Sequence, residues 1–152
     1  MILNVNLSQP TAIAQLSGIA ENGPTGTVAF YPYNSNTLVM ADIYRLPHGN
    51  SICSSGIFGF HIHEGESCSG TDFSETKGHL NPSGCDHPHH AGDLPPLFEC
   101  NGRAFLAVLT DRFQIADVIG KTVVIHSNPD DFTSQPSGNS GKKIACGVIH
   151  PV

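Results

Sequence analysis

Short segments in which apolar and polar residues alternate recur along most of this chain, and this feature most constrains its fold. Alternation of period two places successive side chains on opposite faces of a strand, whereas no long segment shows a convincing helical period. Strands are predicted over residues 12–20, 27–31, 38–44, 57–63, 104–110, 121–126 and 143–149. Gly, Pro and Asn residues separate these segments, and the one helical candidate, 111–119, is short. The pattern is typical of an all-β antiparallel sandwich or barrel.

Two long stretches interrupt the alternation. Residues 64–101 are rich in Gly, Ser, His, Pro and Cys, and residues 127–141 are polar with several prolines and glycines. Loops of this length in a compact fold usually carry function. Because no repeat or linker divides the sequence, residues 1–152 are expected to form a single domain with two long functional loops.

The charge composition argues against two classes of partner. Charged residues make up only 13% of the chain and the formal net charge is −6, without the basic run that nucleic-acid binding requires. No apolar stretch is long enough to span a membrane. Residues 1–8 lack a basic segment followed by a long apolar one, so no signal peptide is expected. The expected compartment is cytoplasmic if Met1 is native, and periplasmic or secreted if a leader was removed.

Histidine is the commonest potential cation, because nine histidines stand against seven lysines and arginines. His61 and His63 occupy alternate positions of a predicted strand, so both rings face one side about 6.5 Å apart and can chelate one metal ion. His87, His90 and Asp93 follow at three-residue spacing, a ligand set that suits zinc. Imidazole ligands in general favour Zn, Cu, Fe or Ni. The alternative is a polar loop with scattered, solvent-exposed histidines.

Several motifs resemble, in order and spacing, the copper–zinc superoxide dismutase family. They are Gly59-Phe60-His61-Ile62-His63-Glu64, Gly78-His79-Leu80-Asn81-Pro82, His87 with His90-Ala91-Gly92-Asp93-Leu94, Val124-Ile125-His126, and the stretch from Gly138 to Ile149. The resemblance runs from about residue 27 to the end and is closer to bacterial members than to animal ones. It implies a Greek-key β-sandwich or flattened barrel, copper and zinc as cofactors, and disproportionation of two superoxide ions to O₂ and H₂O₂.

The resemblance also implies which residues form the site. The ligand sets would be, for copper, His61, His63, His79 and His126, and, for zinc, His79, His87, His90 and Asp93. His79 would bridge the two metals and relay a proton. Asp130 would link a copper histidine to a zinc histidine, a general means of orienting ligand rings; its alternative role is that of a turn residue. A disulfide between Cys68 and Cys146 would tie the first long loop to the last strand.

One position departs from the family pattern. Where the family has an arginine beside the copper, this sequence has Lys143, which keeps the charge but lacks the planar donor fork. Lys143 is therefore expected to hold the superoxide anion less well, and the enzyme to be slower. Residues 127–141 contain no Lys or Arg, and Glu64 and Glu66 follow the first histidine pair. We therefore expect weak electrostatic steering and a weak dependence of the rate on ionic strength.

Three cysteines and three histidines fall outside these assignments. Cys85 and Cys100 flank the implied zinc ligands and are candidates for a second disulfide, which would leave Cys53 unpaired. The alternatives are that both are free thiols or that Cys85 is an adventitious ligand. His48 and His150 are expected to be ordinary surface residues. His89 matches no ligand position and is expected either to face solvent or to be a spare donor.

Two other functions are compatible with the same residues. A non-catalytic metal carrier or buffer on the same scaffold would bind copper without turnover, and Lys143 is the one departure that favours it. A structural sandwich would use the histidines to bind zinc alone. The sequence leaves open whether the chain is a monomer or a homodimer.

Overall fold

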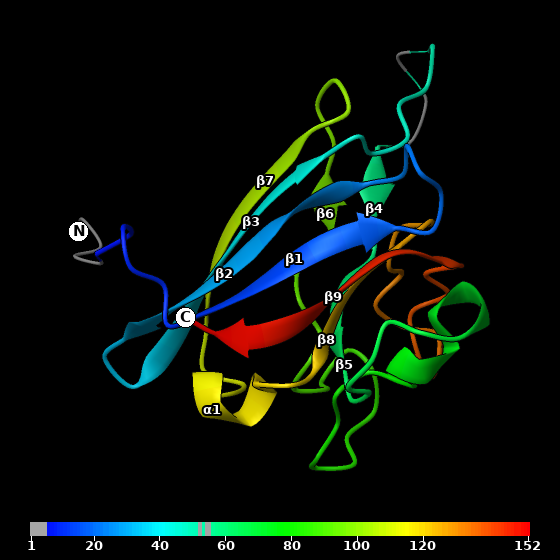
Figure 1. Cartoon of the computed structure of the whole chain (residues 1–152). Helices are drawn as coiled ribbons and strands as arrows, with labels where there is room; N and C mark the ends of the chain where they lie inside the picture. Colours follow the sequence, from blue (N-terminus) through cyan, green and yellow to red (C-terminus); the bar gives the residue numbers. More distant parts are fainter. Residues whose placement is uncertain (1–5, 52, 54–55) are drawn as a thin grey trace.

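The computed structural model describes residues 6–51, 53 and 56–152 (Figure 1). The expectation about a leader rests on residues 1–8, of which residues 1–5 lie outside the described part of the chain. Across the described residues, no helix is long and apolar enough to cross a membrane.

Strands dominate the described residues, and the predicted all-β class is confirmed. The strands are β1 (Ala12–Gly18), β2 (Thr25–Tyr33), β3 (Asn36–Tyr44), β4 (Ile57–Phe58), β5 (Phe60–His63), β6 (Leu97–Phe98), β7 (Ala104–Thr110), β8 (Thr122–His126) and β9 (Lys143–Pro151). The helices are the 3₁₀ helix η1 (Thr71–Thr76) and α1 (Ile115–Val118). The predicted strand 57–63 divides at Gly59 into β4 and β5, and the predicted helix 111–119 is reduced to α1.

The strands form one strongly curled antiparallel sheet and a small second sheet (Figure 1). The large sheet has the order β5-β8-β9-β1-β2-β3-β7, and the small one pairs β4 with β6. The chain passes from β3 to β5 at the far edge before β7 returns to pair with β3, which is the non-sequential connection of a Greek key. Since β4 leads directly into β5 and β6 into β7, the small sheet links the chain segments of the two edge strands. The result is a half-barrel of the predicted kind.

The edge formed by β5 and β8 carries the candidate functional residues, and both faces of this edge are covered. Phe60 and Ile62 of β5 point into the apolar core, where they pack with Val123 and Ile125 of β8. The alternate side chains of both strands point outward, yet they too are buried. The two long loops provide this cover, so polar side chains on the outward face are removed from water.

Candidate metal centre

The outward face of β5 and β8 brings together three histidines from two strands. His61 and His63 alternate with core residues on β5, and His126 ends the neighbouring strand β8. The first long loop adds to this face through isolated bridges that pair His61 with Asp93 and His63 with His79. All of these side chains are buried. Strand alternation and loop pairing together therefore concentrate imidazole rings in one water-poor layer.

The donor atoms of the site, ring nitrogens and one carboxylate oxygen, fall into two groups that could each hold a metal ion. Within each group the donor atoms lie within 4.8 Å of one another. The histidine group consists of His61, His63, His79 and His126. The mixed group consists of His79, His87, His90 and Asp93. These are the two sets that the sequence resemblance implies for copper and zinc.

In the histidine group, the outer ring nitrogens are hydrogen-bonded. His63 Nδ1 donates to the carbonyl of Lys77 at 2.9 Å, and His126 Nδ1 lies 3.4 Å from the carbonyl of Gly141. His61 Nε2 lies 2.6 Å from the Asp130 carboxylate. A neutral imidazole that donates from one nitrogen has a lone pair on the other. The outer contacts therefore orient three lone pairs toward the interior of the group.

The inner nitrogens have no satisfactory protein partner. Among the described residues, His61 Nδ1 and His79 Nε2 are buried without a hydrogen bond. His63 Nε2 and His126 Nε2 lie 3.1 Å apart, so two lone pairs would face each other if both rings donate outward. Buried polar atoms without partners are costly, and facing lone pairs repel. A cation coordinated by these nitrogens removes both problems, so this donor set fits a metal ion.

The mixed group is organised around the Asp93 carboxylate. His79 Nδ1 lies 2.7 Å from Asp93 Oδ1, and His87 Nδ1 lies 3.0 Å from Oδ2. His90 Nδ1 lies 3.3 Å from Oδ2 and 3.4 Å from His79 Nδ1. Three imidazoles and one carboxylate are a normal tetrahedral donor set for zinc. Because Nδ1 of His79 lies here and its Nε2 is left for the histidine group, the ring is placed to serve both groups.

Asp130 connects the two groups from outside. Its carboxylate contacts His61 Nε2 at 2.6 Å and His87 Nε2 at 2.8 Å, and it also accepts a hydrogen bond from the Phe132 backbone N–H at 2.7 Å. Burial alone would raise the pKa of this carboxyl, but the hydrogen bonds from His61, His87 and Phe132 outweigh burial and lower the pKa below its usual range. Asp130 is thus a buried carboxylate that holds both rings, rather than a solvent-facing turn residue.

Burial also favours the neutral form of three rings of the histidine group, those of His61, His63 and His126. It lowers the pKa of His61 and of His63, in the second case well below the ordinary 6.5, and lowers the pKa of His126 to about 3. For Asp93, burial raises the pKa of the carboxyl, but the hydrogen bond with His79 and the charge interactions with His79, His87 and His90 together outweigh it, and the pKa is lowered. Neutral imidazole and ionised carboxylate are the forms that bind metal, so the pKa shifts of these three rings and of Asp93 favour coordination.

Comparison with known proteins identifies the family. A family model described as copper/zinc superoxide dismutase (SODC) matches residues 24–149. The chain belongs to the copper/zinc superoxide dismutase family. Superoxide dismutase [Cu-Zn] 2 of Aquifex aeolicus is 37% identical over 131 residues, covering 76% of this chain and 73% of the relative.

Two further relatives differ in name and coverage. Superoxide dismutase [Cu-Zn] of Deinococcus radiodurans is 32% identical over 169 residues, covering 97% of this chain and 88% of the relative. The copper chaperone for superoxide dismutase of Rattus norvegicus is 31% identical over 158 residues, covering 95% of this chain but 53% of the relative. The relatives at this level of identity are mostly bacterial, in agreement with the branch indicated by the sequence.

The residue at the family's arginine position is held by the first long loop. Lys143 Nζ donates to the Thr76 hydroxyl at 2.7 Å, to the Lys77 carbonyl at 3.0 Å and to the Phe73 carbonyl at 3.4 Å. An ammonium group has three N–H bonds, so these contacts use all of them. Burial lowers the pKa of Lys143. In this member of the superoxide dismutase family, the side chain therefore offers positive charge rather than a free hydrogen-bond donor.

The cysteine predictions have different outcomes. Cys68 and Cys146 form a disulfide that joins the first long loop to β9, as predicted. The prediction of a second disulfide is wrong, because Cys85 and Cys100 are both exposed free thiols. Cys100 lies in the turn between β6 and β7, and Cys85 lies in the loop between η1 and β6. Cys53 is also exposed and free, and Cys85 is in neither metal-binding group.

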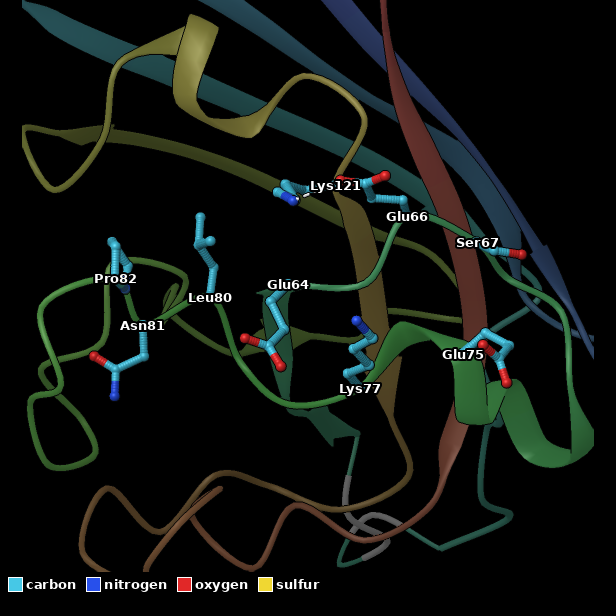
Figure 2. A pocket seen from close by; sticks show the side chains of 9 residues that line it. All are labelled: Glu64, Glu66, Ser67, Glu75, Lys77, Leu80, Asn81, Pro82 and Lys121. Atoms are coloured by element: carbon cyan, nitrogen blue, oxygen red, sulfur yellow. Dashed lines mark hydrogen bonds and ion pairs between the residues drawn. The ribbon is translucent and has the colours of Figure 1, made fainter.

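A pocket of about 560 Å³ lies beside the site, along the chain that flanks His63 and His79 (Figure 2). Figure 2 shows Glu64 and Lys77 at its centre, with Glu75 on the helix η1. Lys121 forms an ion pair with the Glu66 carboxylate at 2.9 Å. With three carboxylates against two lysines in its lining, the pocket brings no net positive charge to the histidines.

Sequence reasoning missed the contacts that come from the backbone. The carbonyls of Lys77 and Gly141 and the N–H of Phe132 orient the site, and no side-chain pattern could have indicated them. The histidines outside the two groups are all exposed, namely His48, His89 and His150. Of these, His48 Nδ1 lies 2.8 Å from the Glu99 carboxylate, away from both groups.

Proposed function

We propose that this chain is an active superoxide dismutase, which converts two superoxide ions and two protons into O₂ and H₂O₂. In this proposal the histidine group holds copper and the mixed group holds zinc, and residues 1–152 form one domain. The observation that carries the proposal is the set of buried inner nitrogens without partners, surrounded by outer nitrogens that are hydrogen-bonded. Imidazole serves both oxidation states of copper, and His/Asp ligation suits zinc.

Bound copper would supply one-electron redox chemistry, which no side chain of this chain provides. His63 and His126 hold their rings in place through the carbonyls of Lys77 and Gly141. His79 is the natural proton carrier, because its Nε2 is buried without a partner while its Nδ1 is held against Asp93. A proton held at Nε2 of His79 can pass to the peroxide product without moving the rest of the loop.

Lys143 attracts and orients the anion in this proposal. Its ammonium group is fixed by acceptors from Phe73, Thr76 and Lys77, so its charge has a defined position. Because all three N–H bonds are engaged, it acts mainly through its charge. This supports the expectation that a lysine here makes a slower enzyme than the planar donor fork of an arginine.

Metal analysis combined with a superoxide assay tests the proposal. Reconstituted protein is expected to bind about one copper and one zinc per chain, and to dismutate superoxide in pulse radiolysis below the diffusional ceiling of about 10⁹ M⁻¹s⁻¹. His126→Ala should lose copper and activity, whereas the matched surface variant His48→Ala should retain both. Copper binding without turnover, or binding of zinc alone, would overturn the proposal.

A non-catalytic copper carrier is the second candidate. It is supported by the match to the rat copper chaperone and by Lys143 at the family's arginine position. The same experiment separates the two functions, because a carrier would bind copper and release it to a chelator or acceptor without dismutating superoxide. Sedimentation of the reconstituted protein would also decide between the monomer and homodimer that the sequence leaves open.

A further inference from the structure

Three of the four mixed-group ligands come from one irregular stretch of backbone. His87, His90 and Asp93 lie within seven residues that form no helix or continuous strand. Their side chains can converge only if the backbone between them keeps its shape. Its last part is held by local contacts: the His90 N–H donates to Asp93 Oδ2 at 3.0 Å, the Asp93 N–H donates to the His90 carbonyl at 3.3 Å, and the Gly92 backbone pairs with Leu80 and Ile62. These contacts leave the backbone groups of His87 and the carbonyl of Pro88 to partners outside the stretch.

Gln135, from the second long loop, holds the start of the stretch. Its side-chain Nε2 donates to the carbonyl of His87 at 2.8 Å, and its Oε1 accepts from the backbone N–H of His87 at 2.9 Å. This reciprocal pair satisfies both backbone groups of one ligand residue. It fixes the position and the orientation of the peptide units on both sides of the His87 ring.

Arg112, which follows β7, holds the rest of the stretch. Its guanidinium Nη1 lies 2.9 Å from the carbonyl of Pro88, 3.3 Å from that of His90 and 3.3 Å from that of Asp93. One cationic group thus faces three carbonyls and makes them converge on one point. Among the described residues, no carboxylate pairs with Arg112, so these carbonyls are its principal polar contacts.

We propose that Gln135 and Arg112 are positioning residues for zinc, forming a backbone clamp on residues 87–93. The inference rests on the proposed metal site and deepens it. Neither residue has a hydrogen bond to a ring of the histidine group. The clamp therefore acts on the mixed group and predicts a selective effect on zinc.

For the removal of Arg112, the clamp and simple electrostatics predict opposite changes in zinc affinity. Removing a positive charge near a cation site should strengthen zinc binding if charge alone matters. If the clamp matters, the same removal should weaken zinc binding, because the carbonyls of Pro88, His90 and Asp93 are released. Outer contacts of metal ligands typically change affinity by about 10–100-fold.

The test measures zinc and copper affinities by chelator competition on the intact, otherwise metal-free protein. The variants are Gln135→Ala and Arg112→Met, separately and together. Gln15→Ala is the matched control for the first, since Gln15 also accepts a side-chain hydrogen bond, from Thr27, but lies on β1. Arg103→Met is the control for the second, since Arg103 pairs with Asp42 on β3, away from the mixed group. Urea unfolding of each metal-free protein reports any general loss of structure.

We expect about tenfold weaker zinc binding for each single variant and about 100-fold for the double variant, with copper affinity within about threefold of wild type. The controls should be unchanged, and the metal-free stability of variants and controls should be similar. Unchanged or tighter zinc binding by Arg112→Met, or equal losses for copper and zinc, would overturn the clamp. A wild-type protein that binds no zinc would overturn the proposed site and the clamp together, which separates that failure from a failure of the clamp alone.

Discussion

Opening the Cys68–Cys146 disulfide should strongly destabilise the metal-free protein. The bond joins residues 78 positions apart and ties the first long loop to β9. In the chain-entropy model, a cross-link over a loop of this length removes on the order of 15 cal/mol/K of entropy from the unfolded chain, which corresponds to about 4.5 kcal/mol at 25 °C. A loss of this size is a large share of the stability of about 5–15 kcal/mol typical of a domain.

The assay compares oxidised and reduced forms of one sequence, so that no side chain changes. Cys53, Cys85 and Cys100 are replaced by Ser in both forms to prevent thiol exchange; because all three are exposed, their replacement should alter the free energy of unfolding by less than about 0.5 kcal/mol. Urea unfolding of the metal-free protein then gives the difference between the two forms. A difference below about 1 kcal/mol would refute the reasoning, since it would mean that the bond removes little entropy from the unfolded chain.

Three further predictions concern charge and close packing at the site. Activity should fall as pH rises through the pKa of Lys143, which burial places below the ordinary 10.5, because only the protonated side chain attracts the anion; Lys143→Arg should move this fall to higher pH and raise kcat/KM at neutral pH. Gly138→Ala should weaken zinc binding at least tenfold by chelator competition, because a Cβ there would meet the Asp130 carboxylate and His87 Nε2. The metal-free protein should lose stability in urea as pH falls from about 6.5 toward 3, because His126 takes up a proton in the unfolded chain first and its folded pKa is lowered to about 3.

Matched variants separate these effects from general damage. Gly120→Ala is the control for Gly138→Ala. Gly120 has a positive φ of 81°, comparable to the 66° of Gly138, but an added Cβ there would have no atom within 4 Å, so this variant reports backbone strain without the clash. Equal zinc affinities for the two alanine variants would contradict the packing argument. Lys142→Arg should leave the alkaline profile unchanged. A metal-free protein whose stability is flat between pH 6.5 and 4 would contradict the buried, neutral histidine.

The sequence was sufficient for those parts of the fold and site that depend on local periodicity. Alternation over residues 57–63 predicted a strand with His61 and His63 on one face, and the structure has β4 and β5 there with both histidines on the outward side. The predicted disulfide between Cys68 and Cys146 is present. This pair could be predicted because the resemblance to the family implies it. Where no such motif applied, as for Cys85 and Cys100, closeness to the same ligands in sequence led to the wrong prediction.

What remained hidden was the set of contacts between segments distant in sequence. Asp130 contacts His61 and His87 across 69 and 43 positions, and Gln135 contacts His87 across 48 positions. The β6 strand was also missed, since two residues are too few to show any period.

The sequence by itself therefore determined which residues are available as ligands, the strand pattern that presents them, and the departure from the family at Lys143. Only the tertiary structure decided which nitrogen of each ring faces inward, how Lys143 is held, and which groups support residues 87–93. The physical reason is that side-chain periodicity is a local property of the backbone. Hydrogen-bond partners of buried rings depend instead on how two loops fold over one edge of a curled sheet.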